Sequence, residues 1–123
     1  MEWMTEQKRN VAGTWLSISG TRIGGDILLC VQGGEQPHIG CVVQTVPRAS
    51  LADPGKVSCT SSVLNMTGHK DEALCRMVAE QVCIANEVTV VCTGGVHIDH
   101  ISGAEIKELL QAAREMADEL VFE

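Results

Sequence analysis

Residues 87–106 have the sequence EVTVVCTGGVHIDHISGAEI, which contains a strand, a polar segment and the start of a helix. The run 87–92 is apolar and rich in valine, so it predicts a strand. Ser102 and Glu105 have the spacing of a capping box, which predicts a helix that begins after Ser102. Between strand and helix, a glycine pair precedes two histidines and an aspartate. Binding groups are often mounted at such junctions.

The residues before this stretch predict four more strands. Apolar and other residues alternate over 11–19, as in a half-buried strand. Three apolar runs, each bounded by turn residues, predict the other strands at 27–32, 39–46 and 57–64. Gly24, Gly25 and Asp26 predict a hairpin between the first two. Pro47 predicts the end of the third.

Helical periodicity replaces the strand pattern after residue 69. Over 70–86, apolar side chains recur at intervals of three and four residues, at Leu74, Val78, Val82 and Ala85. The predicted order is ββββ-α-β-α, which indicates an α+β fold with a mostly antiparallel sheet covered by two helices. A length of 123 residues favours a single domain over 1–123, with its core at about 11–121.

The composition is that of an acidic globular protein, with 45% apolar residues and a net charge of -7. The negative charge argues against nucleic-acid binding, which needs a basic surface. The N-terminal residues lack the pattern of a signal peptide, and no apolar run is long enough to span a bilayer. We therefore expect a cytoplasmic protein. The six cysteines form no CxxC pair, so we expect reduced core residues rather than zinc ligands.

All four histidines lie at the ends of predicted elements, beside glycines. His38 follows the segment 33–37, His69 follows Gly68, and His97 and His100 follow the glycine pair. Glycine lets a ligand approach the backbone, and helix N-termini favour anions, so these segments suit a phosphate-bearing ligand. The alternative is that they are polar turn residues that bond to the backbone, and the pattern leaves both open.

A metal-dependent hydrolase or lyase is a further alternative. His97, Asp99 and His100 offer nitrogen and oxygen ligands, with His38 or His69 from neighbouring segments. In extended backbone, however, His97 and Asp99 share one side while His100 points to the other, which is poor spacing for a metal. Asp99 could instead orient His97 as an acid–base group.

Three segments, taken together, resemble a known family. They are GGEQPHIGCVV at 33–43, TGHKDEAL at 67–74 and CTGGVHIDHISGAEI at 92–106. In this order they resemble the LpdD-like small D subunit of gallate and related hydroxyarylic-acid decarboxylase systems, from about residue 22 to residue 116. The domain is also similar to the proteasome-assembly-chaperone type of small α/β dimer.

The resemblance implies a non-catalytic accessory protein. In that family the decarboxylation belongs to a larger UbiD-like partner that uses prenylated FMN, the product of a UbiX-like flavin prenyltransferase. The small subunit is regarded as a chaperone for this cofactor or for maturation of the decarboxylase. Matching motif positions imply these cofactor-binding residues: Pro37, His38, Gly40, Gly68, His69, Gly95, His97 and Asp99. None of them is implied to be catalytic or to bind a metal, and a purely scaffolding subunit is the remaining alternative.

Two expectations concern surfaces. The chain has only three aromatic residues, so contacts to a flavin ring would come from aliphatic side chains such as Ile39 and Met66. A sheet covered on one face by two helices leaves apolar area on the other, which we expect a homodimer to bury.

Overall fold

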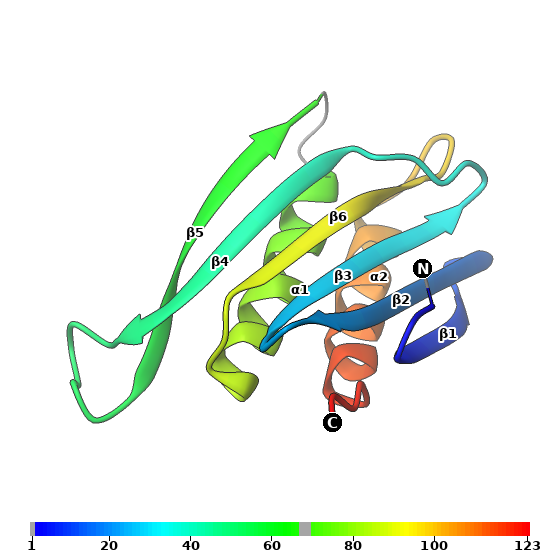
Figure 1. Ribbon diagram of the computed structural model, residues 1–123. Coiled ribbons are helices and arrows are strands. Elements are labelled where there is room, and N and C mark those ends of the chain that lie inside the picture. The colour runs from blue at the N-terminus through cyan, green and yellow to red at the C-terminus, as the bar shows by residue number, and fades with distance from the viewer. Residues whose placement is uncertain (1, 67–69) are drawn as a thin grey trace.

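One six-stranded sheet carries two helices on one of its faces (Figure 1). The structure is a computed structural model that describes residues 2–66 and 70–123, with only the backbone of Lys70. Its elements, in chain order, are β1 Thr5–Val11, β2 Thr14–Ile23, β3 Asp26–Gly34, β4 Cys41–Ala49, β5 Val57–Asn65, α1 Lys70–Asn86, β6 Val90–His97 and α2 Gly103–Asp118.

The strand order is β1-β2-β3-β6-β4-β5, with β6 inserted between the two groups of earlier strands. Every neighbouring pair is antiparallel except β3 and β6. That parallel pair places Gly34, at the end of β3, opposite His97, at the end of β6. Strand β4 begins beside them, because Cys41 pairs with Gly94. Three chain segments therefore meet at one edge of the sheet.

The core lies between the helices and the face of the sheet that they cover. Alternate residues of the central strands point into it, as the period of two in a strand requires. Helix α1 adds a buried stripe at helical spacing, which confirms the predicted amphipathic helix. The largest fully buried side chains include Leu16, Ile18, Leu29, Val31, Val43, Leu74, Val78, Leu109 and Met116.

The predicted α+β class, the mostly antiparallel sheet and the two helices are confirmed, and a strand is added in front. The predicted strand 11–19 is interrupted by a two-residue hairpin at Ala12 and Gly13, which have φ of 52° and 73°. Both values are those of a type I′ turn. Strand β1 lies before this turn. Its side chains alternate between exposed and half-buried positions, which is consistent with its largely polar sequence, TEQKRNV.

Pro47 does not end β4, which continues to Ala49. The hydrogen bonds from Met66 N to Gly40 O and from Ser50 N to Lys56 O mark the positions of β4 that bond to β5. Pro47 lies between such positions, so its nitrogen faces the other side of the strand. On that side pairing with β6 has already ended, at Thr45. A proline is tolerated there because no ladder hydrogen bond is lost.

The glycine pair lies inside a strand rather than after it, because β6 extends to His97. Gly94 pairs with Val31 of β3 and with Cys41 of β4. Its φ is 136°, and a Cβ built on it would overlap the Val31 carbonyl oxygen. Glycine is thus required here by the close approach of the neighbouring backbone.

Four cysteines, at 41, 75, 83 and 92, are buried in the core as expected, and Cys30 and Cys59 are half-buried. Burial raises the pKa of the Cys83 thiol to about 11. Such thiols are poor nucleophiles and behave as small apolar side chains.

We expect Gly94→Ala to lower the free energy of unfolding by at least about 3 kcal/mol, because the new methyl group overlaps the β3 backbone. Gly25→Ala is the matched control, since a Cβ at Gly25 meets nothing within 4 Å. Its effect should stay within about 1 kcal/mol. Urea denaturation followed by circular dichroism measures both, and equal losses would contradict the packing described for β6.

Candidate functional site

The candidate site lies where β3 and β6 end and β4 begins. The segment between Gly34 and Cys41 carries His38, and β6 ends at His97. The two imidazole rings meet edge to face, with their centroids 6.5 Å apart. Both side chains are accessible, at 37% for His38 and 48% for His97. The fold thus places side by side two histidines that are 59 positions apart in the sequence, as 97 minus 38 gives.

Asp71, in the first turn of α1, holds the first histidine in place. Its carboxylate is only 5% exposed and contacts His38 Nε2 through Oδ2 at 3.0 Å. The other oxygen, Oδ1, accepts a hydrogen bond from the Val96 N–H at 3.0 Å. A buried carboxylate is stable only when its oxygens are bonded in this way. One side chain thereby joins the start of α1, strand β6 and the His38 ring.

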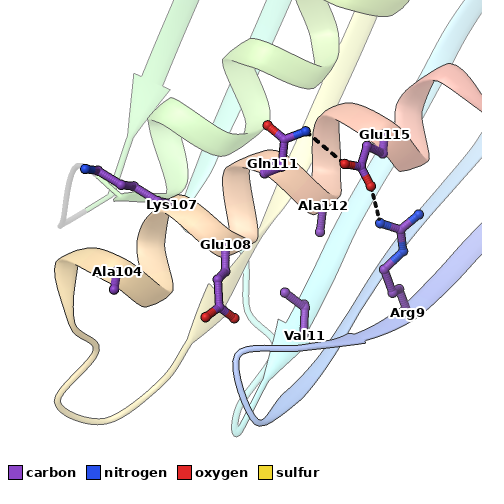
Figure 2. Close-up of a pocket in the computed structure, with 8 residues that line it drawn as sticks. All are labelled: Arg9, Val11, Ala104, Lys107, Glu108, Gln111, Ala112 and Glu115. Atoms are coloured by element: carbon purple, nitrogen blue, oxygen red, sulfur yellow. Dashed lines mark hydrogen bonds and ion pairs between the residues drawn. The ribbon is translucent and has the colours of Figure 1, made fainter.

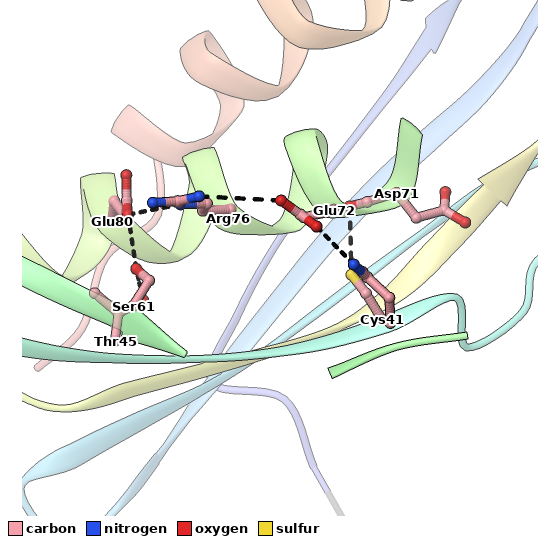
Figure 3. Close-up of polar contacts among 8 residues, drawn as sticks. Cys41, Thr45, Ser61, Asp71, Glu72, Arg76 and Glu80 are labelled. Carbon is pink, nitrogen blue, oxygen red and sulfur yellow. Dashed lines mark hydrogen bonds and ion pairs between the residues drawn. The ribbon is translucent and has the colours of Figure 1, made fainter. Parts of the chain in front are cut away.

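The backbone of Asp71 is attached to β4 as well. Its carbonyl oxygen accepts a hydrogen bond from the Cys41 thiol at 3.4 Å (Figure 3). The same figure shows the carboxylate pointing away from the neighbouring polar contacts along the outer side of α1. There Glu72, Arg76 and Glu80 bond to one another and to β5, with Glu80 accepting from Ser61 at 2.7 Å. The start of α1 is therefore fixed on both sides.

Two glycines of the predicted site make room for this carboxylate. A Cβ built on Gly40 would overlap Asp71 Oδ2, and one on Gly95 would lie 3.0 Å from the same oxygen. The sequence pattern suggested that glycines here admit a ligand to the backbone. In the structure the space beside both is filled by the protein's own Asp71.

His97 has a separate carboxylate partner. Its Nε2 lies 2.8 Å from Asp99 Oδ1, and the Asp99 N–H donates to Glu35 Oε2 at 3.2 Å. The Glu35 N–H in turn donates to the His97 carbonyl at 2.7 Å. These bonds link the segments that follow β3 and β6. They also orient the imidazole with one nitrogen engaged and the other, Nδ1, left for a further contact.

His100 lies outside this arrangement. It adopts a left-handed conformation with φ of 55° and is exposed, and the chain then enters α2. The predicted capping box is present there. Ser102 accepts from the Glu105 N–H at 3.1 Å, and Glu105 accepts from the Ser102 N–H at 3.0 Å.

The structure thus brings six of the predicted site residues to one edge of the sheet, namely Pro37, His38, Gly40, Gly95, His97 and Asp99. Gly68 and His69 lie outside the described residues. Asp71 was missed as a site residue, because an acidic residue in a first helical turn has an ordinary explanation in the helix dipole. Its position three residues before Leu74 was the available signal, since it places the carboxylate on the buried stripe of α1.

Two shallow depressions flank the His38 ring. One, of about 300 Å³, is lined by Gln36, His38 and His97. The other, of about 200 Å³, lies on the side of the sheet away from the helices and is lined by Cys30, Gln32, Pro37, His38, Ile39, Thr93 and Gly94. A polar and a largely apolar surface are therefore adjacent.

A larger groove, of about 440 Å³, runs between β1 and α2 (Figure 2). Two of its charged groups, Arg9 and Glu115, bond to each other at 2.7 Å, and Gln111 bonds to the same carboxylate at 2.8 Å. Among the described residues, no histidine or cysteine lines it. We therefore place the candidate site at the histidine pair and not in this groove.

Metal chemistry finds little support in the geometry. Within residues 2–66 and 70–123, no three histidine, cysteine, aspartate or glutamate side chains are grouped to hold a metal ion. His38 and His97 each use Nε2 on a carboxylate, so each pair is already satisfied. What the arrangement offers is two oriented imidazoles beside an apolar surface, which suits binding of a ligand with an anionic end.

Comparison with known proteins assigns this small α+β domain to a family. A family model described as "Prenylated flavin chaperone LpdD-like domain" matches residues 10–123. The chain belongs to this family, as the three sequence segments implied. No curated protein sequence matches the chain.

Among solved structures, the chain is similar in fold to a chain from "Crystal Structure of a Novel Chaperone Complex for Yeast 20S Proteasome Assembly". The TM-score is 0.50, the sequence identity is 11%, and the match covers 92% of this chain and 97% of that chain. At this identity the likeness concerns the fold alone.

If Gly40 is required because of Asp71, the two positions must be coupled. We expect Gly40→Ala to cost about 2–3 kcal/mol of unfolding free energy in the natural chain, because its methyl group overlaps the carboxylate. In an Asp71→Ala background the same change should cost less than about 1 kcal/mol. Chemical denaturation of the four proteins measures this coupling.

Gly103→Ala serves as the control for that cycle, since a Cβ at Gly103 meets nothing within 4 Å. It should have the same effect with Asp71 present or absent. Additive losses for Gly40→Ala and Asp71→Ala would show that the glycine has another cause.

Proposed function

We propose that this protein binds prenylated FMN and delivers it to a UbiD-type aromatic-acid decarboxylase in the cytoplasm, without catalysing a reaction itself. The membership of the prenylated flavin chaperone family supports the ligand class. The observation that carries the proposal is the histidine pair, fixed by Asp71 and Asp99 and open to solvent. Among the described residues, no helix is long and apolar enough to cross a membrane.

The anionic end of the ligand would lie at the histidine pair. Three carboxylates surround the rings, and each is engaged within the protein: Asp71 by His38 and Val96, Asp99 by His97, and Glu35 by the Asp99 N–H. The carboxylate at each Nε2 orients its imidazole ring. His97 would meet a phosphate through Nδ1, whereas His38 Nδ1 lies 3.3 Å from the Gln36 carbonyl oxygen and would exchange that contact for the phosphate.

The openness of the site fits transfer of a ligand better than its permanent retention. Pockets that hold a cofactor permanently have volumes of roughly 300–1,000 Å³ and bury about 70–90% of the surface of the ligand. Here the depression beside the two rings measures about 300 Å³ and both rings are partly exposed. A ligand bound in it keeps one side free for a receiving enzyme or for a UbiX-like prenyltransferase that supplies it.

We expect His38→Ala and His97→Ala each to weaken the binding of prenylated FMN by about tenfold or more, because each removes a charge-assisted hydrogen bond. His100→Ala is the matched control and should change the dissociation constant by less than about twofold. Titration followed by flavin absorbance or calorimetry gives these values. A wild-type protein that does not bind prenylated FMN, or a His100→Ala loss as large as the others, would refute the proposal.

We also propose that the protein is a homodimer that buries the part of the open sheet face, opposite the helices, that lies away from the histidine pair. This part consists of Leu28, Gln44, Val46 and Val91, which alternate with the core residues of their strands. None of these side chains is charged, although the chain has a net charge of -7. Like-charged copies can approach through such a surface without repulsion.

For the dimer, we expect a molar mass near twice 13.2 kDa by light scattering after size exclusion. Val46→Glu should shift the protein to the monomer, because a two-fold contact brings two added charges together. Ile84→Glu on α1 is the control, since Ile84 and Val46 have similar exposures of 42% and 44%. A dimer that persists in Val46→Glu would exclude this face.

A further inference from the structure

Among the residues that the structure describes, none covers the exposed apolar side chains beside the histidine pair. Ile39 directly follows His38 and is 64% exposed. The end of β5 lies next to it, because Met66 N donates to Gly40 O at 3.0 Å, and Leu64 and Met66 are 74% and 72% exposed. Exposed apolar clusters of this kind, rimmed by polar groups, mark binding surfaces.

The apolar depression lies on the same side of the molecule. Its floor is formed by Cys30 and Gln32 of β3 and Thr93 of β6, and its wall by the segment 37–39. Thr93 Oγ1 donates to the Cys41 carbonyl at 3.0 Å, which turns its methyl group away from that bond. Gln32 adds a polar amide to this floor. The surface is thus mostly apolar, with an amide at one side.

His38 is a wall of both depressions, and Asp71 fixes its ring. A ligand that extends past this ring would have one end at the histidine pair and the other on the apolar floor. At about 200 Å³, the apolar depression alone is smaller than the roughly 300–1,000 Å³ of a usual ligand pocket. It therefore suits one part of a longer molecule.

We propose that this depression is the ring subsite of the flavin, so that the ring system lies against Ile39 and over Cys30 and Thr93 while the phosphate end lies at His38 and His97. The inference rests on the proposed function and adds to it the orientation of the ligand. Aliphatic and sulfur atoms here replace the aromatic platform that the chain lacks. The extra apolar ring of prenylated FMN then gains more from this surface than unmodified FMN does, because it buries more apolar area.

The first test compares two exposed isoleucines. Ile39→Ser should weaken binding of prenylated FMN by about five- to tenfold, and binding of unmodified FMN by less. Ile23→Ser, in the distant hairpin between β2 and β3, is the control, because Ile23 is 61% exposed against 64% for Ile39. Its affinity should stay within about twofold of the natural chain. Circular dichroism confirms that both variants fold.

The second test uses the cysteines as reporters. Cys30 and Cys59 are the half-buried thiols, and Cys59 lies on β5 away from the depression. Saturating prenylated FMN should slow iodoacetamide labelling of Cys30 by about fivefold or more and leave Cys59 unchanged, as peptide mass spectrometry shows. The labelling is repeated in Val46→Glu, so that shielding of Cys30 by a second copy is not mistaken for an effect of the ligand.

The two levels of the proposal fail differently. If the natural chain does not bind prenylated FMN, the proposed function fails and the subsite with it. If binding is present and depends on His38 and His97, but Ile39→Ser behaves as Ile23→Ser and Cys30 labelling in Val46→Glu is unaffected by the ligand, the ring lies elsewhere. In that case the function stands and the subsite is refuted.

Discussion

The buried carboxylate of Asp71 is the contact on which the geometry of the site depends. It accepts from the Val96 N–H and contacts His38, while its own backbone carbonyl accepts from Cys41. Three separate chain segments are thereby fixed at one point. Removing the carboxylate would leave a buried backbone N–H without a partner and a histidine without an orientation, and both are costly in an apolar surrounding. Gly40 and Gly95 leave room for this carboxylate, because a Cβ at either position would overlap or crowd its Oδ2 atom.

Much of the architecture follows from local patterns in the sequence. Helix α1 has the predicted bounds and α2 begins after its capping box, because apolar periodicity and capping residues are short-range signals. Strand β1 was missed because its side chains are largely polar. The glycine pair was placed after the strand because Gly94 serves to admit a neighbouring strand, which its own segment does not reveal. That neighbour, β3, is distant in the sequence and cannot be inferred from a local window.

In the candidate site, too, local sequence patterns predicted some features and only the structure revealed others. Of the segments in which glycines stand beside histidines, the structure brings 33–38 and 94–97 to one edge of the sheet, and Gly68 and His69 lie outside the described residues. The partner of His38 was not predictable from its own segment, because Asp71 belongs to helix α1 and lies 33 positions further along the chain, as 71 minus 38 gives. Pairing of side chains across elements is decided by packing, and only the three-dimensional structure reveals it.

The central position of strand β6 in the sheet affects how the protein unfolds. It joins the β1-β2-β3 meander to the β4-β5 hairpin, and each of those units is otherwise made of contacts between sequence neighbours. The site lies on the seam between them, so a molecule bound there contacts both units at once. Its binding free energy is then added to the cohesion of the whole sheet, and occupancy and resistance to unfolding become linked quantities. A ligand that binds at this seam would make the sheet more resistant to unfolding while the site is occupied than after release.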